Sequence, residues 1–515
     1  MDPISLQNST TSNLLRISGL ASGIDTDSIV KQLMTAASQP LYELEQQKQW
    51  LQWQQEDLQD INTKLLSLRD NTLFKMKLQG TYLAKTVSSN TSIATATAGV
   101  NAVNGTYTLN VNQLATGATS ASTSAIGAYT KNSDGSITYK TLILSGTTYT
   151  LNLNGKQITL GSSDKDWTIN DIVSAINSAN TGSNATGVNA TYDTTTDRLF
   201  LITNSTGSNA KIDFSGTDSN ALNFLTNTLK LNTSTVTGTD ASFSFNDVNM
   251  TTSSNNVTVA GININLTGKG YTTLSVQTDT DTIYNSIKSF VDAYNDVITQ
   301  INSKLTEERY YDYKPLTDAQ KEQMNDNDIT LWQQKARSGD LNGNSTLTSI
   351  YYSLRNAISG TVTASDGTKM TLSSIGITTG QWYEGGKLYI DDTKLKDAIQ
   401  KNPQEVMDLF TKIDSATELN ATPGSSQNDG IAARLYYIVN NGINSITQEA
   451  GGGQYQLYDN SFIGQQINDL NQRISDMQDH LNTLEQQYYN QFTQLETYMA
   501  QMNSQSQWLS QQLSG

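Results

Sequence analysis

The sequence predicts a multidomain α+β protein in which helices from both chain termini pair as an antiparallel coiled-coil leg that carries inserted β-rich head domains. Three observations lead to this fold class. Leucines recur in heptads near the N-terminus, an apolar stripe with similar spacing lies near the C-terminus, and the long middle region alternates apolar and polar residues. With 515 residues the chain has room for roughly three or four domains.

The first helical region spans about residues 25–78. Asp25 is expected to cap its first helix, because an Asp side chain accepts a hydrogen bond from a free N–H group of the first turn. The narrow apolar face of this helix is formed by Ile29, Leu33 and Ala36.

After Pro40 a leucine seam follows at heptad spacing. It consists of Leu44, Leu51, Leu58 and Leu65, with Ile61 and Leu68 in the alternate core position. Gln47 and Gln54 occupy positions where a strong coiled coil has Leu. The seam is therefore expected to be marginal without a partner helix.

The middle region, about residues 79–277, reads as strands separated by turns. Two alternating runs flank Asn154-Gly155, a strong hairpin signal, and a second hairpin is expected in residues 185–204. Thr168 and Asp171 form a capping box at the start of a helix. Because strands resume at about residue 242, residues 129–236 are interpreted as a domain inserted into a flanking β-rich one.

The last region, residues 278–515, is mostly helical again. A broad apolar face begins at Ile283, Thr317 and Gln320 form another capping box, and Asn402-Pro403 separates two helices. The glycine-bearing runs at 421–430 and 451–453 are interpreted as hinges. The C-terminal stripe comprises Leu470, Ile474, Met477, Leu481, Leu484, Tyr488, Leu495, Met499 and Met502.

Both stripes need burial, so we expect the N-terminal stripe to pack on the C-terminal one. We assign to a coiled-coil and assembly interface Ile29, Leu33, the leucine seam and the C-terminal stripe. Residues 1–40 and 485–515 are expected to be largely disordered in an isolated monomer. The predicted domains are terminal helices (1–40 and 485–515), a helical leg (41–78 and 278–484), a β-rich head (79–128 and 237–277) and an outer head (129–236).

The composition excludes several function classes. A net charge of −16 without a Lys/Arg cluster argues against nucleic-acid binding. The chain has no cysteine, which removes disulfides and thiolate chemistry, and no apolar run long enough for membrane insertion. The first residues lack the basic and apolar segments of a cleavable signal peptide, so any export is expected to leave the N-terminus uncleaved.

No catalytic constellation stands out, which predicts a protein without enzymatic activity, cofactor or metal. The single histidine, His480, lies on the C-terminal helix and is expected to face solvent. Asp391 or Asp392 is expected to cap a helix. The Trp residues and Tyr-Tyr pairs leave two alternatives, carbohydrate platforms or interface anchors, and packing is favoured for Trp50 and Trp53.

Several stretches in a fixed order resemble one family. They are SGLASGIDTDSIVKQLM (18–34), GTYTLNVNQLA (105–115), DASFSFNDV (240–248), FVDAYNDVITQIN (290–302), GKLYIDDTKLKDAIQKNPQEVMDLF (386–410) and MNSQSQWLSQQL (502–513). With them the sequence resembles the flagellar filament-capping (hook-associated protein 2) family over nearly its full length. Residues 129–236 are the least similar to that family.

The resemblance implies a bacterial protein exported through the flagellar export apparatus with a chaperone bound near its C-terminal end. It would assemble as a homo-oligomeric ring at the extracellular tip of the flagellum, where flagellin folds and joins the filament end, and so serve motility. The alternatives are a surface adhesin or carbohydrate-binding head that binds host glycans, a junction protein or flagellin, and a secreted glycosidase.

Overall fold

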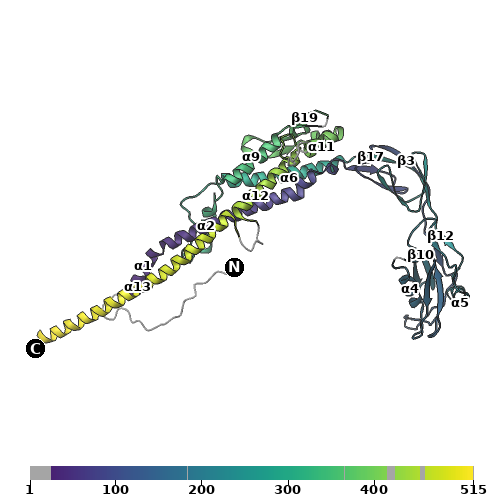
Figure 1. The fold of residues 1–515 in the computed structure, drawn as a ribbon, viewed down its shortest axis with the longest axis horizontal. Helices are drawn as coiled ribbons and strands as arrows, with labels where there is room; N and C mark the ends of the chain where they lie inside the picture. The colour runs from purple at the N-terminus through teal and green to yellow at the C-terminus, as the bar shows by residue number, and fades with distance from the viewer. Residues whose placement is uncertain (1–24, 183, 365, 415–423, 453–458, 514–515) are drawn as a thin grey trace. The chain divides into compact units, whose positions relative to one another are not determined.

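The structure, a computed structural model, describes residues 25–182, 184–364, 366–414, 424–452 and 459–513 (Figure 1). The chain forms two compact units. Unit 1 combines Met1–Gln79 with Tyr284–Gly515, and unit 2 is the intervening Gly80–Ile283. The predicted fold class is confirmed: both termini contribute helices to one unit, and the β-rich part is inserted between them.

Unit 1 is mainly helical. Its helices are α1 (Thr26–Ala37), α2 (Gln39–Ser67), α3 (Phe74–Met76), α6 (Thr280–Thr306, which begins at the end of unit 2), α7 (Asp318–Lys321), α8 (Asp326–Arg337), α9 (Ser345–Ser359), α10 (Asp392–Lys401), α11 (Pro403–Thr411), α12 (Ile431–Ala450) and α13 (Phe462–Leu513). A π-helical turn, η1 (Leu68–Leu73), joins α2 to α3, and two small hairpins pair β18 (Val362–Thr363) with β19 (Lys369–Met370) and β20 (Ile377–Thr379) with β21 (Leu388–Ile390).

Local signals set most helix boundaries where they were predicted. The Asp25 carboxylate accepts a hydrogen bond from the Ser28 N–H at 3.1 Å, and Asp391 caps α10 in the same way. The two predicted capping boxes are present at the starts of α4 (Ile169–Ser178) and α7. Pro403 begins α11, so the break at Asn402-Pro403 is confirmed.

The core of unit 1 lies where α2 packs against α12 and α13 and where α12 packs against α9 (Figure 1). Most of the leucine seam is buried there: Leu44, Leu58 and Leu65 are buried and Leu51 is half-buried. The predicted face of α6 is buried as well, with Ile283, Ile287, Phe290, Val291, Tyr294, Val297, Ile298 and Ile301 all inside.

Unit 2 consists of antiparallel sheets and two short helices. Its larger sheets have the strand orders β1-β17-β3-β13-β14, β15-β16-β2 and β4-β10-β9, and hairpins pair β5 with β6, β7 with β8 and β11 with β12. The strands are β1 (Lys85–Ser88), β2 (Ala94–Ala98), β3 (Gly105–Gln113), β4 (Thr119–Ala121), β5 (Tyr129–Lys131), β6 (Ile137–Tyr139), β7 (Tyr149–Leu153), β8 (Lys156–Leu160), β9 (Val188–Asp193), β10 (Arg198–Thr203), β11 (Lys211–Ile212), β12 (Val236–Thr237), β13 (Ala241–Phe245), β14 (Val248–Thr252), β15 (Asn256–Val259), β16 (Ile262–Leu266) and β17 (Gly270–Thr278). The helices are α4 (Ile169–Ser178) and α5 (Ser219–Asn223).

Both predicted hairpins are present. Leu153 pairs with Lys156 across Asn154-Gly155, whose positive φ angles of 55° and 86° fit a two-residue turn of type I′. Strands β9 and β10 form the second hairpin.

Unit 2 contains two separate hydrophobic cores. One is built from residues between Ala118 and Leu231, and includes Ile172 and Ile176 of α4. The other combines residues between Ala94 and Ala115 with residues between Ala241 and Val276. The domain boundaries given above remain a prediction.

Candidate assembly surface

The first half of α13 is packed within unit 1. This helix of 52 residues lies along α2, and it also contacts α1 and α12 (Figure 1). Leu470 and Leu481 are buried. The residues between and just after them on the stripe are half-buried: Ile474, Met477, Leu484 and Tyr488. The N-terminal and C-terminal helices therefore pack together as the sequence predicts.

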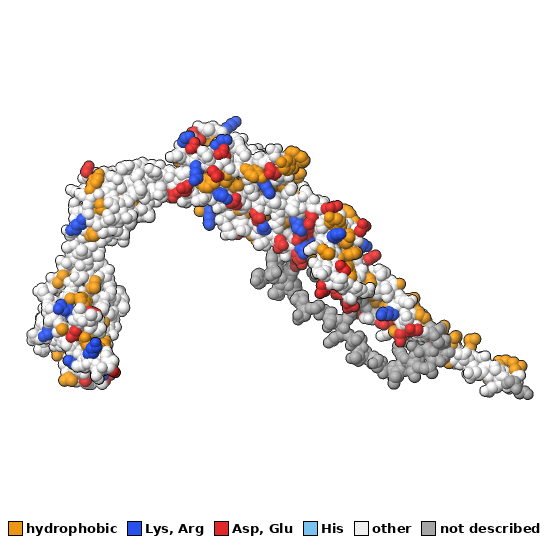
Figure 2. All heavy atoms as spheres, turned by 180° about the vertical axis from the view of Figure 1, so that it is seen from behind, with side chains coloured by type: hydrophobic (Ala, Val, Ile, Leu, Met, Phe, Trp, Pro, Cys, Tyr) orange, Lys and Arg blue, Asp and Glu red, His pale blue; other side chains and the backbone are white. Residues whose placement is uncertain are grey.

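The second half of α13 has an apolar surface that the described part of the chain leaves mostly exposed. None of residues 490–513, all described, is buried. Leu495 is 45% exposed and Met502 is 66% exposed, while Met499 is half-buried. Figure 2 shows hydrophobic side chains at intervals along this end of the helix. We call it the distal stripe; its exposed members are Leu495, Tyr498, Met502, Trp508, Leu509 and Leu513.

On α1 the buried face differs from the predicted one. Thr26 and Val30 are buried, Ile29 is half-buried, and Leu33 is 38% exposed. Ala36 is exposed too, so neither Leu33 nor Ala36 is buried against the C-terminal helix, and their packing on neighbouring subunits stays a prediction. The short helix is followed directly by α2 after Ser38, and α1 contacts α13 with Val30 buried. A role of Ile29 and Leu33 in assembly remains a prediction. The expectation of disorder covered residues 1–40 and 485–515. Residues 1–24, 514 and 515 lie outside the described residues, whereas α1, the start of α2 and residues 485–513 of α13 are helical, so the structure does not show the expected disorder there.

Glutamines in the middle of α2 donate hydrogen bonds to distant parts of unit 1. Gln55 and Gln59 donate hydrogen bonds to the Ala450 carbonyl oxygen at 3.0 and 2.8 Å, and Gln54 donates to the Asp340 carbonyl oxygen at 2.7 Å. Ala450 ends α12, where carbonyl groups have no partner within the helix. Sequence reasoning read Gln54 only as a weak seam position. The missed signal is the row of glutamines at 54, 55 and 59, whose amides reach carbonyl groups of other segments.

A group of charges around the buried carboxylate of Asp57 links α2 to α6 and α8. Asp57 accepts hydrogen bonds from Lys304 Nζ and, at 2.6 Å, from Arg337 Nη2. Arg337 Nη1 also lies 3.1 Å from Glu56 Oε2. Burial raises the pKa of Asp57, but the hydrogen bonds from Lys304, Asp340 and Arg337 outweigh it and hold that pKa below its usual value. No sequence pattern predicted this group, because its members are far apart along the chain.

Asp340 lies beside this group with its side chain completely buried. Among the described residues neither carboxylate oxygen has a hydrogen-bond donor, and the closest cation, Lys304 Nζ, is 3.6 Å away. Burial and then the neighbouring Asp57 carboxylate raise the pKa of Asp340 to about 7. Near neutral pH a proton on Asp340 can therefore be shared with Asp57, which gives two adjacent acids only one net charge.

The remaining predicted positions do not form a catalytic site in the described part of the chain. His480 is exposed on α13, as expected for a solvated helix position. No group of three or more His, Asp or Glu residues that could hold a metal ion occurs among the described residues. None of the described helices combines the length and apolarity needed to cross a membrane. Trp53 is buried and Trp50 half-buried, which supports packing for this pair.

These features define a class of multidomain structural proteins in which paired terminal helices carry inserted β domains. Two family models match the chain: the C-terminal region of flagellar hook-associated protein 2 over residues 238–504, and its N-terminal region over residues 22–118. The flagellar hook-associated protein 2 of Halalkalibacterium halodurans is 31% identical and covers 95% of this chain and 98% of its own. That of Escherichia coli K12 is 26% identical, with 96% and 97% covered. The chain belongs to the flagellar hook-associated protein 2 family.

Solved structures support the fold. The crystal structure of the flagellar cap protein FliD D1-D2-D3 domains from Escherichia coli covers 81% of this chain and 99% of its own, with a TM-score of 0.53 and 23% identity. At that identity the likeness concerns the fold alone.

Proposed function

We propose that this chain caps the bacterial flagellar filament. Its relatives carry the name flagellar hook-associated protein 2, and one structural neighbour is called a flagellar cap protein. In this role several copies form a ring at the filament tip, outside the cell. Exported flagellin folds beneath the ring and joins the filament end, so that it is not lost to the medium. An export chaperone accompanies the chain on its way out of the cell.

The distal stripe is the observation that carries this proposal. A helix end with repeated apolar side chains and no partner in the described part of its own chain supports burial against another molecule. Gln and Asn residues separate these side chains, as in Gln501-Met502-Asn503. Many modest contacts of this kind suit a cap that must hold the filament and still step forward when each subunit enters. Such a role needs no bond chemistry.

The test compares flagellin in the culture medium of cells with and without the gene. Loss of the chain is expected to release unpolymerised flagellin and leave stub filaments, and the wild-type gene is expected to reverse both. Normal filaments in its absence would refute the cap and favour a surface adhesin whose head binds glycans.

Complementation then tests the distal stripe itself. The triple variant Leu495→Ser, Met502→Ser, Leu509→Ser is expected to be exported but not to restore filaments, because it removes apolar contacts from the exposed helix end. The matched control replaces Gln494, Gln501 and Gln507 by Ser in the same segment and is expected to restore them. Equal rescue by both triple variants would contradict the role of the stripe.

A further inference from the structure

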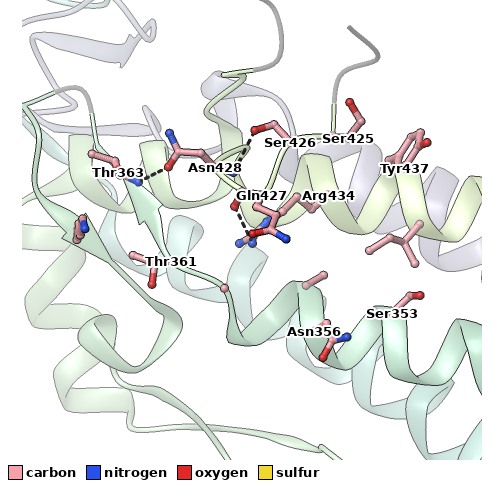
Figure 3. A pocket seen from close by; sticks show the side chains of 15 residues that line it. Ser353, Asn356, Thr361, Thr363, Ser425, Ser426, Gln427, Asn428, Arg434 and Tyr437 are labelled. Carbon is pink, nitrogen blue, oxygen red and sulfur yellow. Dashed lines mark hydrogen bonds between the residues drawn. The ribbon is translucent and has the colours of Figure 1, made fainter.

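A polar cavity lies on unit 1 between α9, α12 and the segment 424–428. Its volume is about 690 Å³. Hydroxyl and amide side chains form much of its wall, and two cations, Arg434 and Lys369, line it. Figure 3 shows Arg434 between the segment that carries Gln427 and the helix α9 that carries Ser353 and Asn356.

Arg434 is buried without a full set of partners. It lies in the first turn of α12 and is only 6% exposed. Its Nη1 donates a hydrogen bond to the Gln427 carbonyl oxygen at 3.1 Å. Its Nε and Nη2 are buried and have no hydrogen-bond partner among the described residues. Since guanidinium stays charged in proteins, two donors of a buried cation are left unpaired.

The nearest buried acid already has other partners. Asp429 is completely buried, and its carboxylate accepts hydrogen bonds from the backbone N–H groups of Asp414, Gly424 and Ser426. The Asp429 charge only partly offsets the burial that lowers the pKa of Arg434. Asp429 therefore orders the loop before α12 and accepts no hydrogen bond from Nε or Nη2 of Arg434.

The backbone leaves room for the guanidinium at Gly360. A Cβ atom at this position would lie 2.0 Å from Arg434 Nη1, so any larger residue would displace the side chain. The arginine is thus held in place by Gly360 on one side and by the Gln427 carbonyl on another.

The two unpaired nitrogens identify the ligand. Nε–H and Nη2–H point the same way along one edge of a guanidinium and match the two oxygens of a carboxylate. Lys369 is exposed to solvent, so Arg434 is the one buried cation among the described lining residues, and a single buried charge suits a monoanion better than a phosphate dianion. We propose that this cavity binds a carboxylate group supplied from outside the chain, with Arg434 as its bidentate anchor. The site is independent of the capping role.

The test uses the full-length chain labelled with ¹⁵N. The Nε–H resonance of Arg434 is assigned by its loss in Arg434→Lys, and sodium acetate is titrated against sodium chloride at constant ionic strength. A saturable shift with acetate alone is expected below about 100 mM, the weak range of a single ion pair. Arg473, exposed on α13 with Asp469 at 3.9 Å, provides a control resonance that should not saturate.

A thermal measurement supplies a readout that does not need the Arg434 signal. Saturating acetate is expected to raise the Tm of wild type and of Arg473→Lys by about 3 °C, and to leave Arg434→Lys unchanged. Two peptides that differ only in a central Glu or Gln separate the sources of the carboxylate. Tighter binding of the Glu peptide than of acetate would assign the site to a protein side chain, and equal binding would assign it to small carboxylates.

The absence of a saturable response to acetate and to the Glu peptide would overturn the proposal, because it would mean that water satisfies the two donors.

Discussion

The two units of this molecule are stabilised by contacts at very different distances along the chain. In unit 2 the two cores lie wholly within residues 94–276, and hairpins such as β7–β8 close over a two-residue turn. In unit 1 the central helix α2 packs on α12 and α13, which follow it by several hundred residues. Gln55 and Ala450, joined by a hydrogen bond, are 395 residues apart. Unit 2 can therefore fold from its own segment, whereas unit 1 needs both ends of the chain.

Deletion of α13 is expected to give the largest difference between the unfolding of unit 1 and that of unit 2. Deletion of residues 462–515 removes buried Ile463, Leu470 and Leu481, each worth about 2–5 kcal/mol, which is comparable to the whole stability of a domain. We expect the unfolding transition of unit 1 to disappear in scanning calorimetry and that of unit 2 to stay in place.

The shorter deletion of residues 490–515 is the control. It removes no buried residue among the described 490–513 and should leave both transitions unchanged. A drop of the unit 2 transition after the longer deletion would contradict the independence of the units.

A single substitution should show the same contrast within one helix. Leu470→Ala is expected to lower the free energy of unfolding of unit 1 by about 3 kcal/mol, because it opens a cavity at a buried position. Leu495→Ala removes the same atoms from an exposed position and should cost less than about 0.5 kcal/mol. Denaturant titration of purified monomer measures both. Similar costs would show that the distal stripe is buried in solution.

Asp340 should make the stability of unit 1, and not that of unit 2, depend on pH near neutrality. Its pKa is about 7 in the folded chain against a usual 3.8, so its stabilising effect is complete below the lower value and is lost as the pH rises to the higher one. Asp340→Asn keeps a neutral group there. The free energy of unfolding of the variant, relative to wild type, should rise by about 2 kcal/mol between pH 4 and 7 and stay constant above pH 7. This rise is smaller than the full pKa shift would give, because part of that shift belongs to the coupled Asp57.

Unfolding of both proteins by urea from pH 5 to 9 measures this difference. The pKa of Asp57 is lowered, so Asp57 stabilises the folded chain above its usual pKa. Both proteins contain Asp57, so its effect on the free energy of unfolding largely cancels in the difference between them. A constant difference between the two proteins over this range would contradict the shared proton.

The smallest effect is expected in unit 2. Gly155 has a φ of 86°, and no atom lies within 4 Å of the place that a Cβ would take, so Gly155→Ala introduces backbone strain without a clash. We expect a loss of about 1 kcal/mol in the unit 2 transition and none in unit 1. Gly80→Ala, where the nearest atom lies at 4.0 Å and φ is not positive, is the matched control and should be neutral. A shift of the unit 1 transition by Gly155→Ala would argue against separate units.

Local chemistry explains what could be predicted. Capping side chains such as Asp25 and Asp391, the turn at Asn154-Gly155 and the break at Pro403 act over a few residues, so the sequence shows them directly. The heptad spacing likewise identified the buried leucines of α2. The buried face of α1 was not predicted correctly, because a short helix with few apolar residues takes its orientation from the helices around it. Val30, and not Leu33, is buried against them.

By itself, then, the sequence determined the fold class, the capped helix starts, the two hairpin turns and the existence of two apolar stripes, because these depend on neighbouring residues and on periodicity. Only the tertiary structure decided how far the C-terminal stripe is covered: Leu481 is buried by partner helices and Leu495 is not, although both obey the same spacing. The tertiary structure alone brings together Asp57, Lys304, Arg337 and Asp340. It also leaves two hydrogen-bond donors of Arg434 without a partner among the described residues. Burial and charge pairing depend on which distant segments of the chain come into contact, and the spacing of residues along one helix does not show which segments these are.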